Sequence, residues 1–215
     1  MIALATLKDP ELFWQDHAAW LESNGYKLRA RYQPGWEPNI PVSRLIPSSN
    51  EDFFSMARMA IVDAVRMEDG KRVLLKRVLR SDHPHEVAIT KYFSTTPLSN
   101  DTRNHCVQLQ DMLYPANRPD TTILVFPFLQ QLTALRFDTI AEILDFIRQI
   151  FGLQFMHRNH VAHRDIDVCN IMMDGEDFFP EGWNQRFPSL TPDGTRRAKA
   201  FTRTQRPPKY YSTTC

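Results

Sequence analysis

The sequence has few cysteines, no long apolar run and almost no net charge. Its three cysteines, Cys106, Cys169 and Cys215, are odd in number and widely spaced. This excludes a disulfide framework and favours a reducing, intracellular and cytoplasmic setting. No stretch approaches the roughly 18 apolar residues that a membrane span needs, and a net charge of +1 gives no basic field for nucleic acid. We therefore expect neither a membrane nor a nucleic-acid partner.

Glycine is scarce as well, and its distribution excludes one kind of binding loop. None of the seven glycines lies between Gly35 and Gly70. A glycine-rich loop holds phosphate groups through closely spaced backbone amides. We therefore expect no such loop in this part of the chain.

What is present is the composition of a globular protein. Of the 215 residues, 42% are hydrophobic and 24% are charged, which is enough for one sizeable core or two small lobes. Residues 7–26 predict a first helix that begins near Asp9 and ends at Gly25. The prolines of residues 33–49 predict an extended connector. Residues 50–65 fit an amphipathic helix capped by Asn50, although the residues that follow favour a hairpin from about Ala60.

The middle of the chain predicts strands that alternate with helices. Two strand-like runs flank the turn dipeptide Asp69-Gly70, which predicts a β-hairpin from Ala60 to Val78. A helix is expected over residues 83–94, and strands are expected over residues 105–114 and 121–132. Residues 138–159 predict one long helix with a wide apolar stripe, formed by Ile140, Ile143, Leu144, Ile147, Ile150, Phe151 and Phe155. The last part, rich in proline, arginine and threonine, predicts mostly loop.

A short motif then indicates a family. The run His163-Arg164-Asp165, with Asn170 after four further residues, resembles the catalytic loop of protein kinases. Upstream, "VLLK" ending at Lys76 resembles the third-strand motif of that family, and "LVFPFL" over residues 124–129 resembles its fifth strand and hinge. "GYKLRARYQPGW" and "RNHCVQLQDML" are more similar still to a group of fungal protein-kinase-domain proteins.

The resemblance implies a fold and a division of the chain. The fold would be α+β and protein-kinase-like, with an antiparallel-sheet N-lobe and the beginning of a helical C-lobe. Residues 1–50 would form an N-terminal helix and connector, 51–130 the N-lobe, 131–175 the start of the C-lobe with its catalytic loop, and 176–215 an insertion or tail that is mostly loop.

The resemblance also implies ATP and Mg²⁺ as cofactors, a protein substrate, and phosphoryl transfer to its serine or threonine hydroxyls. Asp165 would orient the acceptor hydroxyl, and Arg164 would anchor the activation segment. Lys76, held by Glu86, would contact the α- and β-phosphates. Asn170 would hold magnesium, Phe126 would close the back of the nucleotide pocket, and the backbone of Pro127 and Leu129 would bind adenine.

Three departures from the family pattern weaken the expected activity. The glycine-rich loop is missing, and Asp167 stands where serine/threonine kinases usually place a lysine. The chain also contains no "DFG", the motif that supplies a second metal-binding carboxylate. "RPPKYY" resembles the strand that leads into that motif, so the chain looks cut off after Tyr211. We therefore expect residues 1–215 to bind nucleotide weakly or not at all, to lack transfer activity, and to expose the apolar stripe of the long helix.

Two alternatives from other classes stay open. His157, His160, His163 and Cys169 have spacings that could hold zinc, although His163 already belongs to the catalytic-loop match. The chain could also be a non-catalytic, pseudokinase-like module that binds a protein partner.

Overall fold

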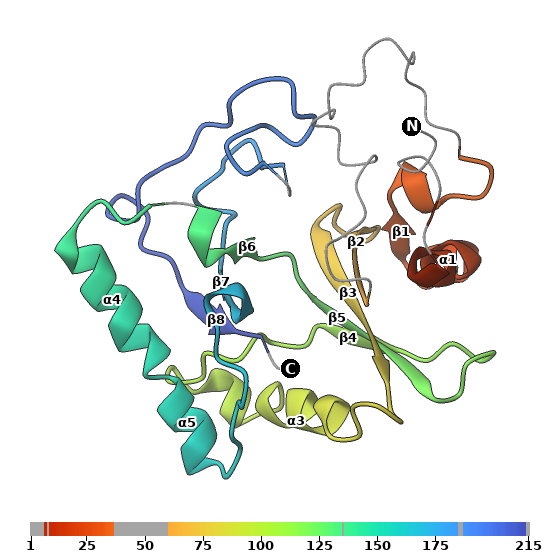
Figure 1. The fold of residues 1–215 in the computed structure, drawn as a ribbon, viewed down its shortest axis with the longest axis horizontal. Coiled ribbons are helices and arrows are strands. Elements are labelled where there is room, and N and C mark those ends of the chain that lie inside the picture. The colour runs from red at the N-terminus through yellow and green to blue at the C-terminus, as the bar shows by residue number, and fades with distance from the viewer. Residues whose placement is uncertain (1–6, 8, 37–59, 135, 185–186, 214–215) are drawn as a thin grey trace.

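The computed structural model describes residue 7 and residues 9–36, 60–134, 136–184 and 187–213. Within them the chain forms a five-stranded sheet, a three-stranded sheet and several short helices, so the architecture is α+β as predicted. Figure 1 shows helices α1 and α4 at opposite ends of the molecule, with the two sheets between them. In chain order the elements are α1 (Asp9–Asp16), α2 (Ala18–Ser23), β1 (Tyr26–Leu28), η2 (Ala30–Tyr32), β2 (Ile61–Arg66), β3 (Arg72–Leu79), α3 (Glu86–Phe93), η5 (Leu98–Asn100), β4 (Asp111–Leu113), β5 (Thr121–Pro127), β6 (Gln130–Gln131), η6 (Leu132–Ala134), α4 (Ile140–Ile150), α5 (Leu153–Arg158), η7 (Val168–Asn170), β7 (Ile171–Met173) and β8 (Tyr210–Ser212).

The large sheet has the strand order β1-β2-β3-β5-β4, and each neighbouring pair is antiparallel. The predicted hairpin is confirmed, because β2 and β3 pair across a turn in which Gly70 has a φ of +70°. The predicted apolar strand is also confirmed, since β5 lies between β3 and β4. The connector predicted over residues 33–49 and the alternative helix from Asn50 lie largely outside the described residues.

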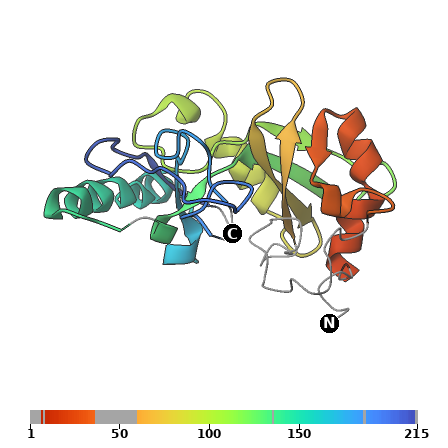
Figure 2. The same ribbon diagram turned by 90° about the horizontal axis from the view of Figure 1, so that it is seen from above.

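The two faces of the large sheet differ, because side chains alternate along each strand. What we name the outer face carries Val62, Ala64, Val73, Leu75, Ile123 and Val125, and every one of these is buried. The helices α1 and α2 cover this face with Phe13, Trp14 and Leu21 (Figure 2). The outer face is therefore a closed apolar core.

The opposite face, which we name the inner face, carries both charge and apolar groups. Its residues include Asp63, Leu74, Lys76, Val78, Leu124 and Phe126. Val87 of α3 and Tyr211 of β8 pack against its apolar part. The inner face is thus the side of the sheet on which elements from distant parts of the chain meet.

The small sheet pairs β7 with β6 on one side and with β8 on the other. Tyr210 and Met173 are buried on the side that packs against Phe146 and Ile150 of α4. The segment between β7 and β8 has a core of its own, in which Phe178 and Trp183 pack against Phe128. Residues 176–215 are mostly loop, as predicted, but this loop is folded onto the rest of the chain.

Helix α4 turns its apolar stripe outward. Its capping box joins Thr139 and Glu142, and the Thr204 hydroxyl donates to Glu142 Oε1 at 2.6 Å. The chain between β7 and β8 therefore covers the side of α4 that carries the glutamate. Five residues on the other side are 41–76% exposed, namely Ile140, Ile143, Leu144, Ile147 and Phe151. The predicted exposure of the stripe is confirmed for these five, whereas Ile150 is partly buried and Phe155 is buried.

Two predicted helices are each broken in the structure. The first ends at Asp16 and resumes at Ala18. At the break, the Phe13 carbonyl accepts from the His17 amide at 3.2 Å and also lies 2.7 Å from His17 Nδ1. The long helix is interrupted at Phe151 and Gly152. There the Gly152 amide bonds to Gln149 three residues back, and the His105 ring lies so close that a Cβ on Gly152 would be 2.6 Å from it.

The strand expected over residues 105–114 is shorter than predicted. Only Asp111–Leu113 pairs with β5 as a named strand. Upstream, Cys106 forms an isolated bridge with Ser212 of β8. The residues before β4 lie beside β8 of the small sheet instead, so they do not continue along β5.

Candidate functional site

Lys76 on the inner face forms an ion pair with Glu86 of α3. Lys76 Nζ lies 2.5 Å from Glu86 Oε1, and the glutamate side chain is only 2% exposed whereas the lysine side chain is 24% exposed. Glu86 is the first residue of α3, where the helix dipole favours a negative charge. The predicted contact is confirmed. Lys76 keeps enough exposure for its ammonium to meet a second anion.

Apolar side chains lie next to this ion pair. In the register of the sheet, Leu124 is opposite Lys76, and Phe126 is opposite Leu74. Pro127 ends the strand opposite Val73, and Leu129 is partly buried against the same apolar cluster as Phe126. Phe126 and Leu129 therefore continue the apolar wall that begins beside Lys76, whereas Pro127 shares the outer face with Val73.

Asp165 and Asn170 form the second pair. The Asn170 side-chain amide donates to Asp165 Oδ2 at 2.7 Å and to the Asp165 carbonyl at 2.9 Å. Asn170 is buried and Asp165 is exposed. The asparagine thus holds an exposed carboxylate in one orientation, which is what a group that orients a hydroxyl needs.

Hydrogen bonds hold the loop that carries this pair to Thr213, the residue that follows β8. His163 Nε2 lies 2.7 Å from the Thr213 carbonyl, and the Asp165 amide donates to His163 Nδ1 at 3.4 Å. The Thr213 amide in turn donates to the Asn170 carbonyl at 3.0 Å. His163 is 6% exposed, so it acts as a buried link between the loop and the strand.

Because buried flanks keep a catalytic loop rigid, the sequence predicts burial of Val161 and Ala162 before the loop and of Ile171–Met173 after it. Ile171 and Met173 are buried, as this reasoning predicts. Val161 is only partly buried and Ala162 is exposed, so the predicted burial before the loop is wrong. Hydrogen bonds of His163, rather than apolar packing, fix this end of the loop.

Arg164 stands apart from the other predicted residues. It has a φ of +64°, which is unusual for a residue with a side chain. Its guanidinium is exposed and makes no hydrogen bond or ion pair with the described residues. The loop positions this side chain toward solvent, and its role as an anchor stays a prediction.

The donor set for a metal is incomplete within the described residues. No three His, Cys, Asp or Glu side chains come together there in a way that could hold a metal ion. Asp167 accepts from the Cys169 amide at 2.8 Å, and Asp174 accepts from the Glu176 amide at 3.1 Å. The residues described do not assemble a magnesium or zinc site, and Asn170 as a magnesium ligand stays a prediction.

Sequence reasoning missed a buried charge cluster on the inner face. Asp63, 3% exposed, lies 2.8 Å from Arg29 Nε and 3.0 Å from Arg72 Nη2. The guanidinium of Arg72 also lies 4.0 Å above the ring of Phe128. The signal was a single aspartate inside the apolar run "IVDAV", because a charge in the middle of a buried strand needs a partner.

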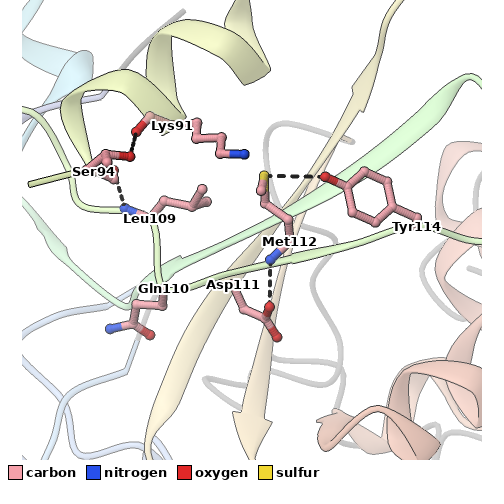
Figure 3. Close-up of a pocket in the computed structure, with 8 residues that line it drawn as sticks. Lys91, Ser94, Leu109, Gln110, Asp111, Met112 and Tyr114 are labelled. Carbon is pink, nitrogen blue, oxygen red and sulfur yellow. Dashed lines mark hydrogen bonds between the residues drawn. The ribbon is translucent and has the colours of Figure 1, made fainter.

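A hollow of about 310 Å³ lies elsewhere, between the end of α3 and the edge strand β4 (Figure 3). Lys91, Met112 and Tyr114 line it, together with Ser94, Thr95, Leu109, Gln110 and Asp111. It includes none of the predicted site residues. A smaller hollow of about 150 Å³ is lined by Arg72, Phe128, Glu176, Gly182, Trp183 and Pro192.

Two pairs of predicted residues are therefore assembled, and residues 211–213 link them. Tyr211 packs on the apolar cluster that contains Leu124, the cross-strand neighbour of Lys76, while Thr213 bonds to the Asn170 backbone. No helix within the described residues is long and apolar enough to cross a bilayer. No protein-family model matches the chain, and no curated protein matches it either.

Proposed function

We propose that this chain is a protein-kinase-like protein whose family activity is ATP-dependent phosphoryl transfer to serine or threonine hydroxyls of a protein. We further propose that residues 1–215 alone do not carry out the transfer. The observation that carries the first part is the Lys76–Glu86 ion pair, because it joins a strand to the first residue of a helix ten positions later. A buried carboxylate that orients a partly exposed ammonium suits the binding of phosphate.

Each remaining residue has a role in this proposal. Asp165, held by Asn170, would orient the acceptor hydroxyl and take its proton. Phe126, Pro127 and Leu129 would form the adenine side of the site. Arg164, exposed on a strained backbone, would contact a segment or partner that carries negative charge.

The absence of transfer follows from what phosphoryl transfer needs. Most of its rate comes from positioning and charge neutralisation. The loss of one well-placed stabilising group costs a factor of about 10² to 10³. The chain contains neither a glycine-rich loop nor "DFG", and its described residues bring no metal-binding carboxylates together. These losses together reduce transfer to background.

A second candidate function is a non-catalytic module that binds a protein. The exposed apolar stripe of α4 favours it, since large apolar patches on a surface mark sites of association. The two candidates share the fold and differ only in whether phosphate is bound and transferred.

Lysine labelling tests the nucleotide part of the proposal. An acyl-phosphate derivative of ATP acylates lysines near its phosphates, and mass spectrometry locates the product. Although nucleotide binding is expected to be weak, ATP-competed labelling of Lys76 in β3 should exceed that of Lys91 in α3, which lines the other hollow. Equal labelling of both lysines, or labelling that ATP does not compete, contradicts the proposal.

A transfer assay tests the second part. Purified chain, magnesium, labelled ATP and a generic protein substrate are compared with the Asp165→Ala variant. We expect the same background rate from both. A wild-type rate clearly above that of the variant would show that residues 1–215 are catalytically complete.

A further inference from the structure

Adjacent tyrosines of β8 lie on opposite sides of the small sheet, as alternation requires. Tyr210, 1% exposed, packs on the side of α4, with its ring centroid 5.0 Å from that of Phe146. Tyr211 packs on the other side, against the apolar cluster that contains Leu124 and Phe126. Tyr211 is therefore the aromatic side chain that the small sheet presents to the inner face of the large sheet.

The surroundings of Tyr211 combine apolar side chains with a nearby cation. Leu74 and Leu129 pack against the same cluster from the strand and from the hinge. The Lys209 ammonium lies 5.2 Å from the centre of the Tyr211 ring. Burial, and then the nearby Asp174 carboxylate, raise the pKa of the phenol. A flat ring thus contacts apolar side chains and lies near a cation, a setting that suits any planar aromatic group.

We propose that Tyr211 is the built-in occupant of a site for a planar aromatic ring, and that an external ring, such as the base of a purine nucleotide, enters only when this side chain is displaced. The nucleotide as ligand rests on the proposed function. The occupied aromatic site itself rests on the packing of Tyr211 alone.

The backbone beside the ring is held by several hydrogen bonds. The Ser212 amide donates to the His105 carbonyl at 2.8 Å, and the Val107 amide donates to the Ser212 carbonyl at 3.1 Å. The Thr213 amide is bonded to Asn170. Displacement is consequently a rotation of the side chain, and truncation of the side chain empties the site without removing the strand.

The test compares the wild type with Tyr211→Ala and, as the matched control, with Tyr114→Ala, which removes a 58% exposed tyrosine. Indole serves as a planar probe without phosphate, and ATP serves as the nucleotide. Both are titrated by calorimetry into each protein. An apolar space left by a removed side chain binds small aromatic molecules. We expect Tyr211→Ala to bind indole and to bind ATP at least 10-fold more tightly than the wild type and Tyr114→Ala do.

The outcomes separate this proposal from the proposed function. If Tyr211→Ala binds indole but not ATP, the result supports an aromatic site occupied by Tyr211 and contradicts the proposed binding of nucleotide. If folded Tyr211→Ala binds neither probe, or if the wild type binds indole equally well, the occupied site is overturned. Should Tyr211→Ala not fold, Tyr211→Leu keeps apolar contact without a flat ring, and at least a 3-fold gain in indole affinity over the wild type is then required.

Discussion

The two faces of the large sheet are built from the same strands but have different chemistry. The outer face is mainly apolar, with Arg77 as its cation, and is covered by α1 and α2, which come from the same end of the chain. The inner face mixes leucines with Asp63 and Lys76, and it meets α3 and β8 from distant parts of the sequence. Burial of charge costs free energy and is retained where charge has a use. The comparison therefore assigns stability mainly to the outer face and places the residues of the proposed function on the inner face.

The largest expected effect compares neighbouring leucines on the two faces. Leu75 is fully buried on the outer face, whereas Leu74 is partly buried on the inner face. We expect Leu75→Ala to lower the free energy of unfolding by about 3–5 kcal/mol, because it leaves a cavity in a closed core. Leu74→Ala should cost about 1 kcal/mol. Denaturant unfolding measures both, and equal losses would remove the distinction between the faces.

The next comparison uses the two cations that follow these leucines along β3, Lys76 on the inner face and Arg77 on the outer face. Lys76→Met leaves the buried Glu86 carboxylate without its cation, and we expect a loss of about 3 kcal/mol. Arg77 lies over the Phe13 ring on the outer face, so Arg77→Met should cost only about 0.5–1 kcal/mol. The double variant Lys76→Met/Glu86→Leu should recover most of the loss. A double variant as unstable as Lys76→Met would mean that the charge itself is not the cause.

Alkaline pH should act on the outer face through Tyr32. Burial raises the pKa of this phenol to about 12, from 10 in the unfolded chain. The neutral phenol is favoured in the folded state, so this stability is fully present below pH 10 and is lost as the pH rises toward 12. We expect the wild type to lose about 2 kcal/mol between pH 9 and pH 11.5 from this group.

The control for Tyr32 is a pair of conservative variants. Tyr32→Phe should lack that part of the alkaline loss, whereas Tyr92→Phe, which changes a 47% exposed tyrosine, should retain it. Denaturant unfolding at the two pH values measures the difference. The same alkaline loss in both variants would show that another group is responsible.

The smallest effect on stability is expected at α4, where the contrast between covered and exposed faces occurs within one helix. Leu144 is 59% exposed, and we expect Leu144→Lys to change the free energy of unfolding by less than about 0.5 kcal/mol. It should also reduce aggregation in light scattering, because it interrupts the apolar stripe. Phe146→Lys, on the packed side, is the destabilising counterpart. Unchanged aggregation in Leu144→Lys would show that the stripe is not the surface that associates.

What the sequence predicted correctly depended on short-range chemistry. The turn at Asp69-Gly70 lies within the hairpin that it forms, and the apolar run of β5 requires a central strand whatever surrounds it. The Lys76–Glu86 contact followed from a motif whose spacing reflects how one strand and one helix pack. Asp165 and Asn170 were predicted as members of one short loop, and the hydrogen bond between them was found only in the structure.

What could not be predicted depended on partners far away in the chain. His105 lies against Gly152, where the predicted long helix is interrupted, and this contact joins residues that are far apart in the chain. Arg203 donates to the Leu132 carbonyl and to Tyr210, so the segment expected as a loose tail is fastened by a buried guanidinium. Contacts between distant residues leave no periodic pattern in the local sequence, so the sequence alone could not predict them.

The strand β8 has a kinetic consequence. It pairs with β7 only after residues 174–209 have closed into a loop, whereas β2 and β3 meet across a turn of a few residues. Hairpins form within about 1–10 μs, and the closure of a long loop costs additional chain entropy before any contact repays it. During refolding the hairpin that carries Lys76 should therefore be in place early. The packing of the small sheet against the large sheet should form late. The hydrogen bonds between Thr213 and the loop that carries Asp165 should form at the same stage.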